Sequence, residues 1–419
     1  MEKSGIYKID LPLLNRMGFT GSPASSSLRV FGGNGGMLPE ANATSRPDDL
    51  VELAITVEDG GDGNFGPGDY LLFYAEGPET WQKDSINRNF RHQKNRYSRY
   101  NYYYISVQGT GERVEMLSSA ISANQTVSQY DGRFFHELDT INFLASGKEW
   151  YGEEFAEAPG KTAQRSFALS LPNSISGAPA SLRTACIARS VGNSSRYDIR
   201  LGTTNLGSLT VLPTGAGQYD AFAREGTAEF NFPYTDGALQ FQFFPGSFNA
   251  QGWLNWFEVF NRRSLNMQEQ VQIDFRDWST VGTGPVRFEI SNPSASMRVW
   301  DITEVHRPIQ MSLSTTGSIA SFINETNRLR EYIAFNPVAV PTPELVERIN
   351  NQDLHATSAV DYLIVTHPTL LNAANYLADI HRQQQSLRVR VVTTQQIFHE
   401  FSAGKADPVA IRDFVKNVF

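Results

Sequence analysis

The stretch Leu239-Gln-Phe-Gln-Phe243 alternates apolar rings and aliphatic side chains with amides at every second position. The same period of two recurs at 167–171, 197–201, 271–275 and 286–290. Successive side chains of a β-strand point to opposite faces of the sheet, so each stretch predicts a strand with one apolar and one polar face. Strands of this kind, repeated between about 165 and 302, predict antiparallel sheets packed as a jelly-roll-like β-sandwich.

The part of the chain before this sandwich is also predicted to be rich in β-structure. Short apolar runs at 70–74 and 102–107 are bounded by segments rich in Gly and Pro, a pattern typical of strands and turns. We therefore expect a β-rich amino-terminal domain over residues 1–135 and the sandwich domain over residues 136–335.

The pattern changes after the proline-rich stretch 336–343. The predicted elements that follow are a buried strand at 362–365, a helix carrying Leu370, Ala374, Leu377 and His381, a second strand at 389–392, a helix at 394–401 stopped by Gly404, and a helix begun by Asp407-Pro408. This order predicts the opening of a parallel α/β sheet. Two parallel strands cannot complete such a sheet, so we expect residues 336–419 to be a linker and the first two βα units of an incomplete domain.

Composition excludes several classes of protein. The 419 residues suggest about three domains. Lys and Arg minus Asp and Glu gives 36 − 44 = −8, the opposite of the charge expected for a general nucleic-acid binder. Charged residues make up 19% and aromatic residues 12%, which excludes a disordered chain. No apolar run reaches the roughly 18 residues of a transmembrane helix, and residues 1–5 lack the apolar core of a signal peptide.

One glycine-rich loop has the spacing of a calcium site. Glu58, Asp62 and Asp69 occupy positions 1, 5 and 12 of an EF-hand-like loop, and Asn64 is placed to offer its carbonyl oxygen at position 7. Position 3 is Gly60, which has no ligand side chain, and position 12 is Asp rather than Glu. The alternative is a Gly-Asp hairpin turn with solvated carboxylates.

Two other features have both a functional and a structural interpretation. Residues 88–104 interleave basic and aromatic side chains, which suits a glycan or protein contact but equally a strand whose basic edge discourages pairing. His367 follows a predicted parallel strand at the end where α/β folds bind ligands, or it is simply the entry residue of the next helix before Pro368. The single cysteine, Cys186, can form neither an internal disulfide nor a zinc site by itself.

Several segments resemble the amino-terminal half of the type IX secretion system sortase family, gingipain-like cysteine peptidases of Bacteroidota. The segments are 29–40, 68–75, 92–98, 146–152, 351–356, 361–368, 391–397 and 407–413. The resemblance implies β-rich domains before a caspase-like α/β catalytic domain. It also implies export and an outer-membrane or cell-surface address.

The resemblance carries over no catalytic residue. In the family, the catalytic His, commonly followed by Gly, and then the catalytic Cys lie downstream of the first βα units. This chain contains no His-Gly dipeptide, and Cys186 lies in the predicted sandwich, where a small buried residue with an inert thiol is expected.

Two functions follow as hypotheses. In the first, the chain is the non-catalytic amino-terminal region of a sortase that cleaves sorting domains from exported cargo and attaches the cargo to the cell surface. Its implied partners are cargo proteins with carboxyl-terminal sorting domains and other secretion-system components. In the second, the chain is a surface-exposed β-sandwich module for binding or adhesion, without enzymatic activity.

Overall fold

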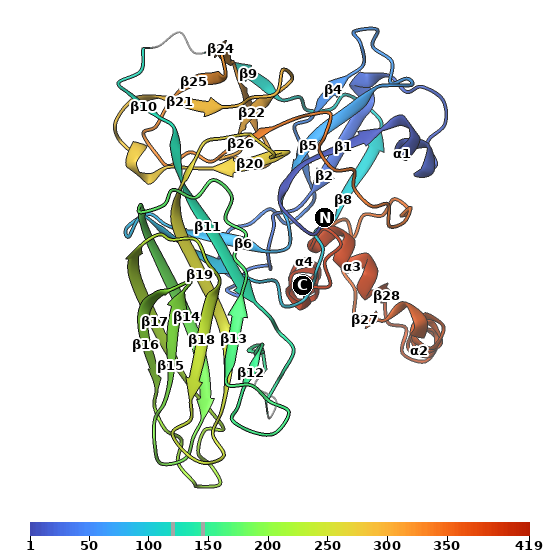
Figure 1. Ribbon diagram of the computed structural model, residues 1–419. Helices are drawn as coiled ribbons and strands as arrows, with labels where there is room; N and C mark the ends of the chain where they lie inside the picture. The colour runs from blue at the N-terminus through green and yellow to red at the C-terminus, as the bar shows by residue number, and fades with distance from the viewer. Residues whose placement is uncertain (119–121, 144–146) are drawn as a thin grey trace.

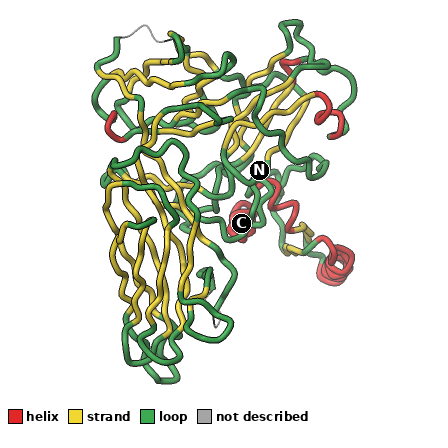
Figure 2. The backbone as a smooth tube through the Cα atoms, viewed as in Figure 1, coloured by secondary structure: helices red, strands yellow, loops and turns green. Residues whose placement is uncertain are grey.

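The computed structural model describes residues 1–118, 122–143 and 147–419. Three β-rich bodies make up most of the molecule, and the longer helices gather at the carboxyl-terminal end of the chain (Figures 1 and 2). No helix of these residues is both long and apolar enough to cross a membrane. The prediction of a mainly β architecture followed by the start of an α/β unit is confirmed.

The first body is built from two three-stranded sheets. One sheet has the order β1 (Gly5–Asp10), β5 (Tyr70–Ala75), β4 (Thr56–Glu58), and the other has the order β3 (Val51–Leu53), β2 (Leu28–Gly32), β8 (Tyr103–Val107). Helix α1 (Leu11–Arg16) begins at Asp10, whose side chain accepts the Leu13 N–H. Apolar side chains of both sheets share one core, which includes Val30, Leu71 and Phe73.

A hairpin leaves this body and reaches the jelly roll. It consists of β6 (Thr80–Asp84) and β7 (Asn89–Gln93). Phe90 of β7 packs in a small core with Trp278 and Leu329, which lie outside the hairpin. The His92 ring is held between two carboxylates of the jelly roll, with Nε2 2.5 Å from Glu137 and Nδ1 2.8 Å from Glu258.

The second body is a jelly roll. Its main strands are β11 (Gln129–Glu137), β13 (Gln164–Phe167), β14 (Pro179–Arg189), β15 (Ser195–Leu201), β16 (Thr204–Val211), β17 (Arg224–Pro233), β18 (Leu239–Phe244) and β19 (Gln251–Ser264). The sheets have the orders β11-β19-β14-β17 and β13-β18-β15-β16, and β12 (Glu154–Phe155) also pairs with β19. From β13 to β19, consecutive strands thus alternate between the sheets, except that β15 and β16 are neighbours in one sheet, which is the double Greek key of a jelly roll.

The alternation found in the sequence explains the jelly-roll core. Tyr197, Ile199, Phe241 and Phe243 are fully buried between the sheets. The prediction at 167–171 is only partly right, because β13 ends at Phe167.

Residues 265–335 form a third body with its own core, although we expected one sandwich over 136–335. Its strands are β20 (Gln272–Phe275), β21 (Pro285–Ser291), β22 (Arg298–Asp301), β23 (Ile309–Met311), β24 (Ser314–Thr316), β25 (Ile319–Glu325) and β26 (Tyr332–Phe335), joined by β9 (Glu115–Leu117) and β10 (Gln125–Val127). Strands β9 and β10 pair in parallel with β23 and β21, so part of the expected first domain belongs here. Alternation shows which face of a strand is apolar but not which strand lies beside it.

The end of the chain has the predicted α/β order. Strands β27 (Tyr362–Thr366) and β28 (Val389–Thr393) pair in parallel, and helix α2 (Leu371–Gln385) connects them. Helices α3 (Thr394–Phe401) and α4 (Pro408–Val418) follow and pack beneath the first body (Figure 1).

Candidate functional site

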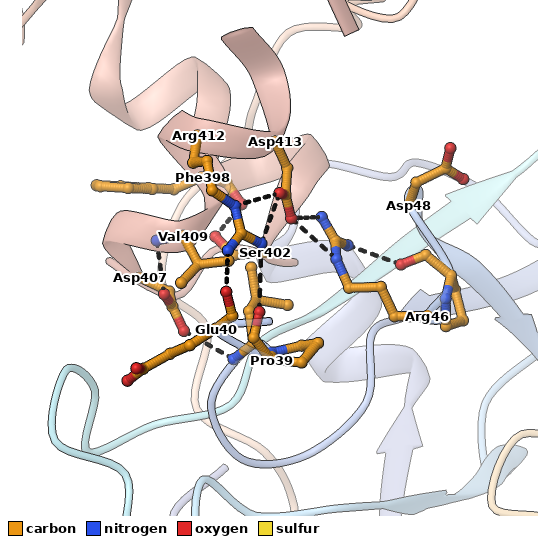
Figure 3. A network of polar contacts seen from close by, with 12 residues as sticks. Pro39, Glu40, Arg46, Asp48, Phe398, Ser402, Asp407, Val409, Arg412 and Asp413 are labelled. Atoms are coloured by element: carbon orange, nitrogen blue, oxygen red, sulfur yellow. Dashed lines mark hydrogen bonds and ion pairs between the residues drawn. The ribbon is translucent and has the colours of Figure 1, made fainter. Parts of the chain in front are cut away.

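A polar interface joins the first body to the α/β end of the chain (Figure 3). We call it the docking seam; it consists of loop 33–49 on one side and of α3, α4 and the segment 402–407 on the other. At its centre, Asp407 caps α4, since its Oδ1 accepts the Val409 N–H at 2.9 Å. The other oxygen, Oδ2, accepts the Leu38 N–H at 2.8 Å. One carboxylate that is 1% exposed therefore both starts the helix and holds the loop.

Two arginines strengthen the docking seam from opposite sides. Arg46 of the loop forms an ion pair with Asp413 of α4. Arg412 of α4 donates to the backbone carbonyls of Glu40 and Pro39, and it lies 2.8 Å from Asp413 (Figure 3). An arginine of the loop thus binds α4, and an arginine of α4 binds the loop, so both segments specify the interface.

A buried lysine completes the polar part of the docking seam. Lys405 is 2% exposed, and its Nζ donates to the Asn34 carbonyl at 2.6 Å and lies 3.3 Å from the Asn101 side-chain oxygen. Burial lowers the pKa of Lys405 to about 8, while the negative charges of Glu76 and Asp407 act in the opposite direction. The ammonium group is thus held by oxygens of the first body.

Two glycines leave no room for a side chain at the docking seam. Gly404 has a φ of +87°, and a Cβ there would lie 2.8 Å from the Tyr104 hydroxyl. A Cβ on Gly33 would lie 2.9 Å from that of Ala403. The side chain of Leu38 packs against the apolar core of the α/β unit, which includes Phe414. The docking seam therefore combines side chains packed closely against glycine with an apolar contact.

Next to the docking seam, three potential metal ligands converge. Ligand atoms of Asp353, His355 and Glu400 lie within 4.8 Å of one another. Both Glu400 oxygens accept the Leu354 N–H, at 2.9 and 2.8 Å, and Oε2 is 3.0 Å from His355 Nδ1. His355 Nε2 is 3.1 Å from the Asp48 carbonyl oxygen. The cluster thus forms a hydrogen-bonded link between the linker, α3 and loop 33–49.

A large cleft of about 1620 Å³ adjoins this cluster, since Asp353 and Glu400 are among its lining residues. Its walls are strand β8, the extended segment 342–353 and the exposed side of α3. Tyr104 of β8 reaches across to α3, where its hydroxyl is 3.0 Å from His399 Nδ1. Burial lowers the pKa of His399, and burial raises the pKa of Tyr104, so both groups are neutral at physiological pH.

The residues predicted to bind calcium do not converge in the described structure. Glu58 forms an ion pair with Arg298 at 2.6 Å. Asp62 accepts the Asn64 N–H at 2.8 Å, and Asp69 accepts a glycine N–H at 2.6 Å. Across residues 1–118, 122–143 and 147–419, the one converging group of potential metal ligands is the cluster at Glu400. The calcium assignment made from the sequence therefore stays a prediction.

The other residues considered from the sequence have structural surroundings. His367 caps a short 3-10 helix, Pro368–Leu370, with Nδ1 3.3 Å from the Thr369 N–H. Cys186 is fully buried in the jelly roll, and burial raises the pKa of its thiol. In the described parts of the chain, no histidine forms a hydrogen bond with it. In the basic and aromatic segment, Lys94 and Arg96 form ion pairs.

Sequence reasoning identified Asp407 as a helix cap but missed its role in the docking seam. The signal that was available is that segments 29–40 and 407–413 both carry the family resemblance. Nothing in either segment alone shows that Leu38 and Asp407 are in contact.

Comparisons with known proteins agree with this architecture. A family model described as Peptidase family C25 matches residues 355–419, which begin just before the α/β unit. No curated protein matches the chain. A β-rich region with a jelly roll thus precedes the start of a segment similar to a peptidase domain.

Among solved structures, the chain is similar to dimeric latent PorU from Porphyromonas gingivalis. The sequence identity is 25%, the TM-score is 0.85, and the match covers 99% of this chain and 39% of that chain. The resemblance expected from the sequence is therefore confirmed, and this chain spans well under half the length of the PorU chain.

Two structures of the VP2 protein of infectious bursal disease virus also match. The subviral particle shows 8% identity, a TM-score of 0.18 and coverage of 91% of this chain and 88% of that chain. The structure of the Gx strain shows 11% identity, a TM-score of 0.19 and coverage of 91% of this chain and 87% of that chain. Neither TM-score supports an argument about the fold or function of this chain.

Proposed function

We propose that this chain is the amino-terminal region of a gingipain-like cysteine peptidase that acts as a sortase in type IX secretion. The whole enzyme cleaves the sorting domain from an exported cargo protein and attaches the cargo to the cell surface. A thiolate activated by histidine attacks the peptide bond, and an amine or water resolves the acyl-enzyme. The similarity to PorU and the Peptidase family C25 segment support this proposal.

Within that enzyme, the role of this chain is to position the α/β unit rather than to supply the nucleophile. The observation that carries this role is the docking seam, in which Asp407, Arg412 and Lys405 all bind backbone groups of the first body. Catalytic groups must be held to within a fraction of an ångström by rigid supports. An α/β unit that is fixed at α4 provides such a support for strands that follow in the catalytic domain.

The proposed partners and location follow from the same relationship. The partners are cargo proteins with carboxyl-terminal sorting domains and other components of the secretion system. The proposed location is the outer membrane or the cell surface. The similarity to PorU supports the location, whereas the partners are those that the family resemblance of the sequence implies.

The proposal is tested in the full-length protein. Arg412→Ala should reduce cleavage of a reporter cargo that carries a sorting domain, because it removes two contacts to the loop carbonyls. The matched control is Arg328→Ala, which removes an exposed ion pair to Glu304 in the third body. Equal activity of both variants would contradict the positioning role.

The coding sequence after Phe419 tests the enzymatic assignment separately. We expect a continuing α/β domain with a His followed by a Cys. A stop codon at that point, or a continuing domain without these residues, would favour a binding or adhesion module instead.

A further inference from the structure

The large cleft runs along an open sheet edge. Strand β8 is the outermost strand of the sheet β3-β2-β8 in the described structure. Every residue from Tyr100 to Gln108 lines the cleft. Alternate side chains of a strand point to opposite faces, so consecutive residues can line one cleft only if it follows the edge of the strand.

The register shows which backbone groups of β8 face the cleft. The Gln108 N–H donates to the Ser27 carbonyl at 3.0 Å, a distance typical of a β-ladder. Gln108 therefore directs its backbone groups toward the β2 side. Hydrogen-bonded pairs alternate along an antiparallel ladder, so Tyr103, Ile105 and Val107 direct their backbone N–H and C=O groups away from β2. These three residues therefore present donors and acceptors to the cleft.

One residue of the chain already pairs with this edge. The Asn101 N–H donates to the Met1 carbonyl at 2.9 Å, and the Met1 amino group donates to the Asn101 carbonyl at 2.6 Å. Asn101 lies two residues before Tyr103, so along this strand its backbone groups point to the same side as those of Tyr103, Ile105 and Val107. The reciprocal bonds at Met1 show that an extended backbone fits beside β8 at hydrogen-bonding distance.

The charge and the aromatic groups of the cleft favour a basic ligand. The exposed carboxylates Glu2, Asp49, Glu344 and Glu347 on its lining outnumber the cations, which are Lys3, Arg348 and the Met1 amino group. Tyr100 and Tyr102 also line it and offer ring faces to an ammonium or guanidinium group. The long aliphatic stems of Lys and Arg would cover the apolar part of the wall.

We propose that the cleft binds an extended peptide with basic side chains, which adds as a strand to the open edge of β8. The backbone groups of Tyr103, Ile105 and Val107 bind the peptide main chain, as in other cases of strand addition. Glu344 and Glu347 on the segment 342–353 select lysine or arginine side chains. This ligand is independent of the sortase assignment. Its main-chain contacts use no residue of the docking seam, although Asp49, α3 and Gly404 also line the cleft.

The first test measures binding of a fluorescent short peptide of alternating lysine and valine to the full chain by anisotropy. We expect saturable binding. The same peptide N-methylated at every residue keeps its charge but loses all of its backbone donors, so its binding should be lost. Equal binding of the two peptides, or no binding of the first, would overturn the proposal. So would equal binding of a peptide of alternating glutamate and valine.

The second test changes the protein. Glu344→Lys combined with Glu347→Lys should weaken binding by about fivefold or more, because both side chains are exposed in the free protein and their reversal removes attraction and adds repulsion. Glu304→Lys is the matched control on an exposed site of the third body and should leave binding unchanged. Equal weakening by both variants would overturn the assignment to this cleft. Sedimentation of the unliganded protein provides a further check, since a dimer that the double variant disrupts would assign the edge to a second copy instead.

Discussion

Replacing Asp407 by alanine should release the α/β unit from the first body. The substitution removes the cap of α4, which costs about 1 kcal/mol. It also leaves the partly buried Leu38 N–H without its acceptor, which costs about 1–3 kcal/mol. The two losses together predict that the docking seam is weakened by about 2–4 kcal/mol. Loss of the negative charge also lowers the pKa of Lys405 further, because Asp407 raises it in the native protein.

Hydrogen exchange followed by mass spectrometry measures this loss locally. At about 1.4 kcal/mol per factor of ten, peptides covering 36–40 and 408–414 should lose protection by roughly 30-fold to several hundred-fold, while the jelly roll is unchanged. Asp407→Asn retains a helix cap and one acceptor, so its effect should be smaller. The control is Asp379→Ala, which removes only an exposed ion pair of α2. Unchanged protection at 36–40 in Asp407→Ala would refute the argument that this carboxylate joins the two bodies.

Three further predictions concern other parts of the molecule. Burial acts to lower the pKa of His92, but its hydrogen bonds to Glu137 and Glu258 outweigh burial and raise it. The contribution of His92 to stability should be full below its unfolded pKa of about 6.5 and should be lost as the pH rises through its higher pKa in the folded protein. The melting temperature of His92→Gln should therefore depend less on pH above 6.5 than that of the unmodified protein. Cys186 should react with a thiol reagent only after unfolding, and rapid labelling of the native protein would contradict its burial. Gly404→Ala should destabilise the protein by about 1–2 kcal/mol in chemical denaturation, since φ is +87° there; an unchanged midpoint would show that the turn relaxes.

The α/β end of the chain was predictable because its signals are local. The helix expected at 394–401 has those bounds in the structure, where Thr393 and Gln396 form a capping box. Gly404 ends it in the left-handed region, and Asp407 starts the next helix as expected. Each of these signals acts within one helical turn, so no knowledge of distant residues is needed.

The division into bodies was predictable only in part. Alternation identified the apolar faces of β15, β18 and β21, and the jelly-roll topology agrees with the sandwich expected from it. It did not separate the jelly roll from the third body, since strands in both have the same period. Val271 shows the same limit, because it continues an alternating pattern and yet is 42% exposed just before β20 begins.

The sequence by itself determined the alternating strands of the sandwich region, the strands and helices of the α/β end, the inert surroundings expected for Cys186, and the family that the chain resembles. Only the tertiary structure decided that β9 and β10 join strands far along the chain, that Asp407 binds Leu38, and that the edge of β8 faces an acidic cleft. The physical reason is the range of each interaction. Side-chain period and helix capping depend on neighbours within a few residues, whereas the contact between Asp407 and Leu38 joins groups 369 residues apart, and packing of the intervening bodies alone brings them together.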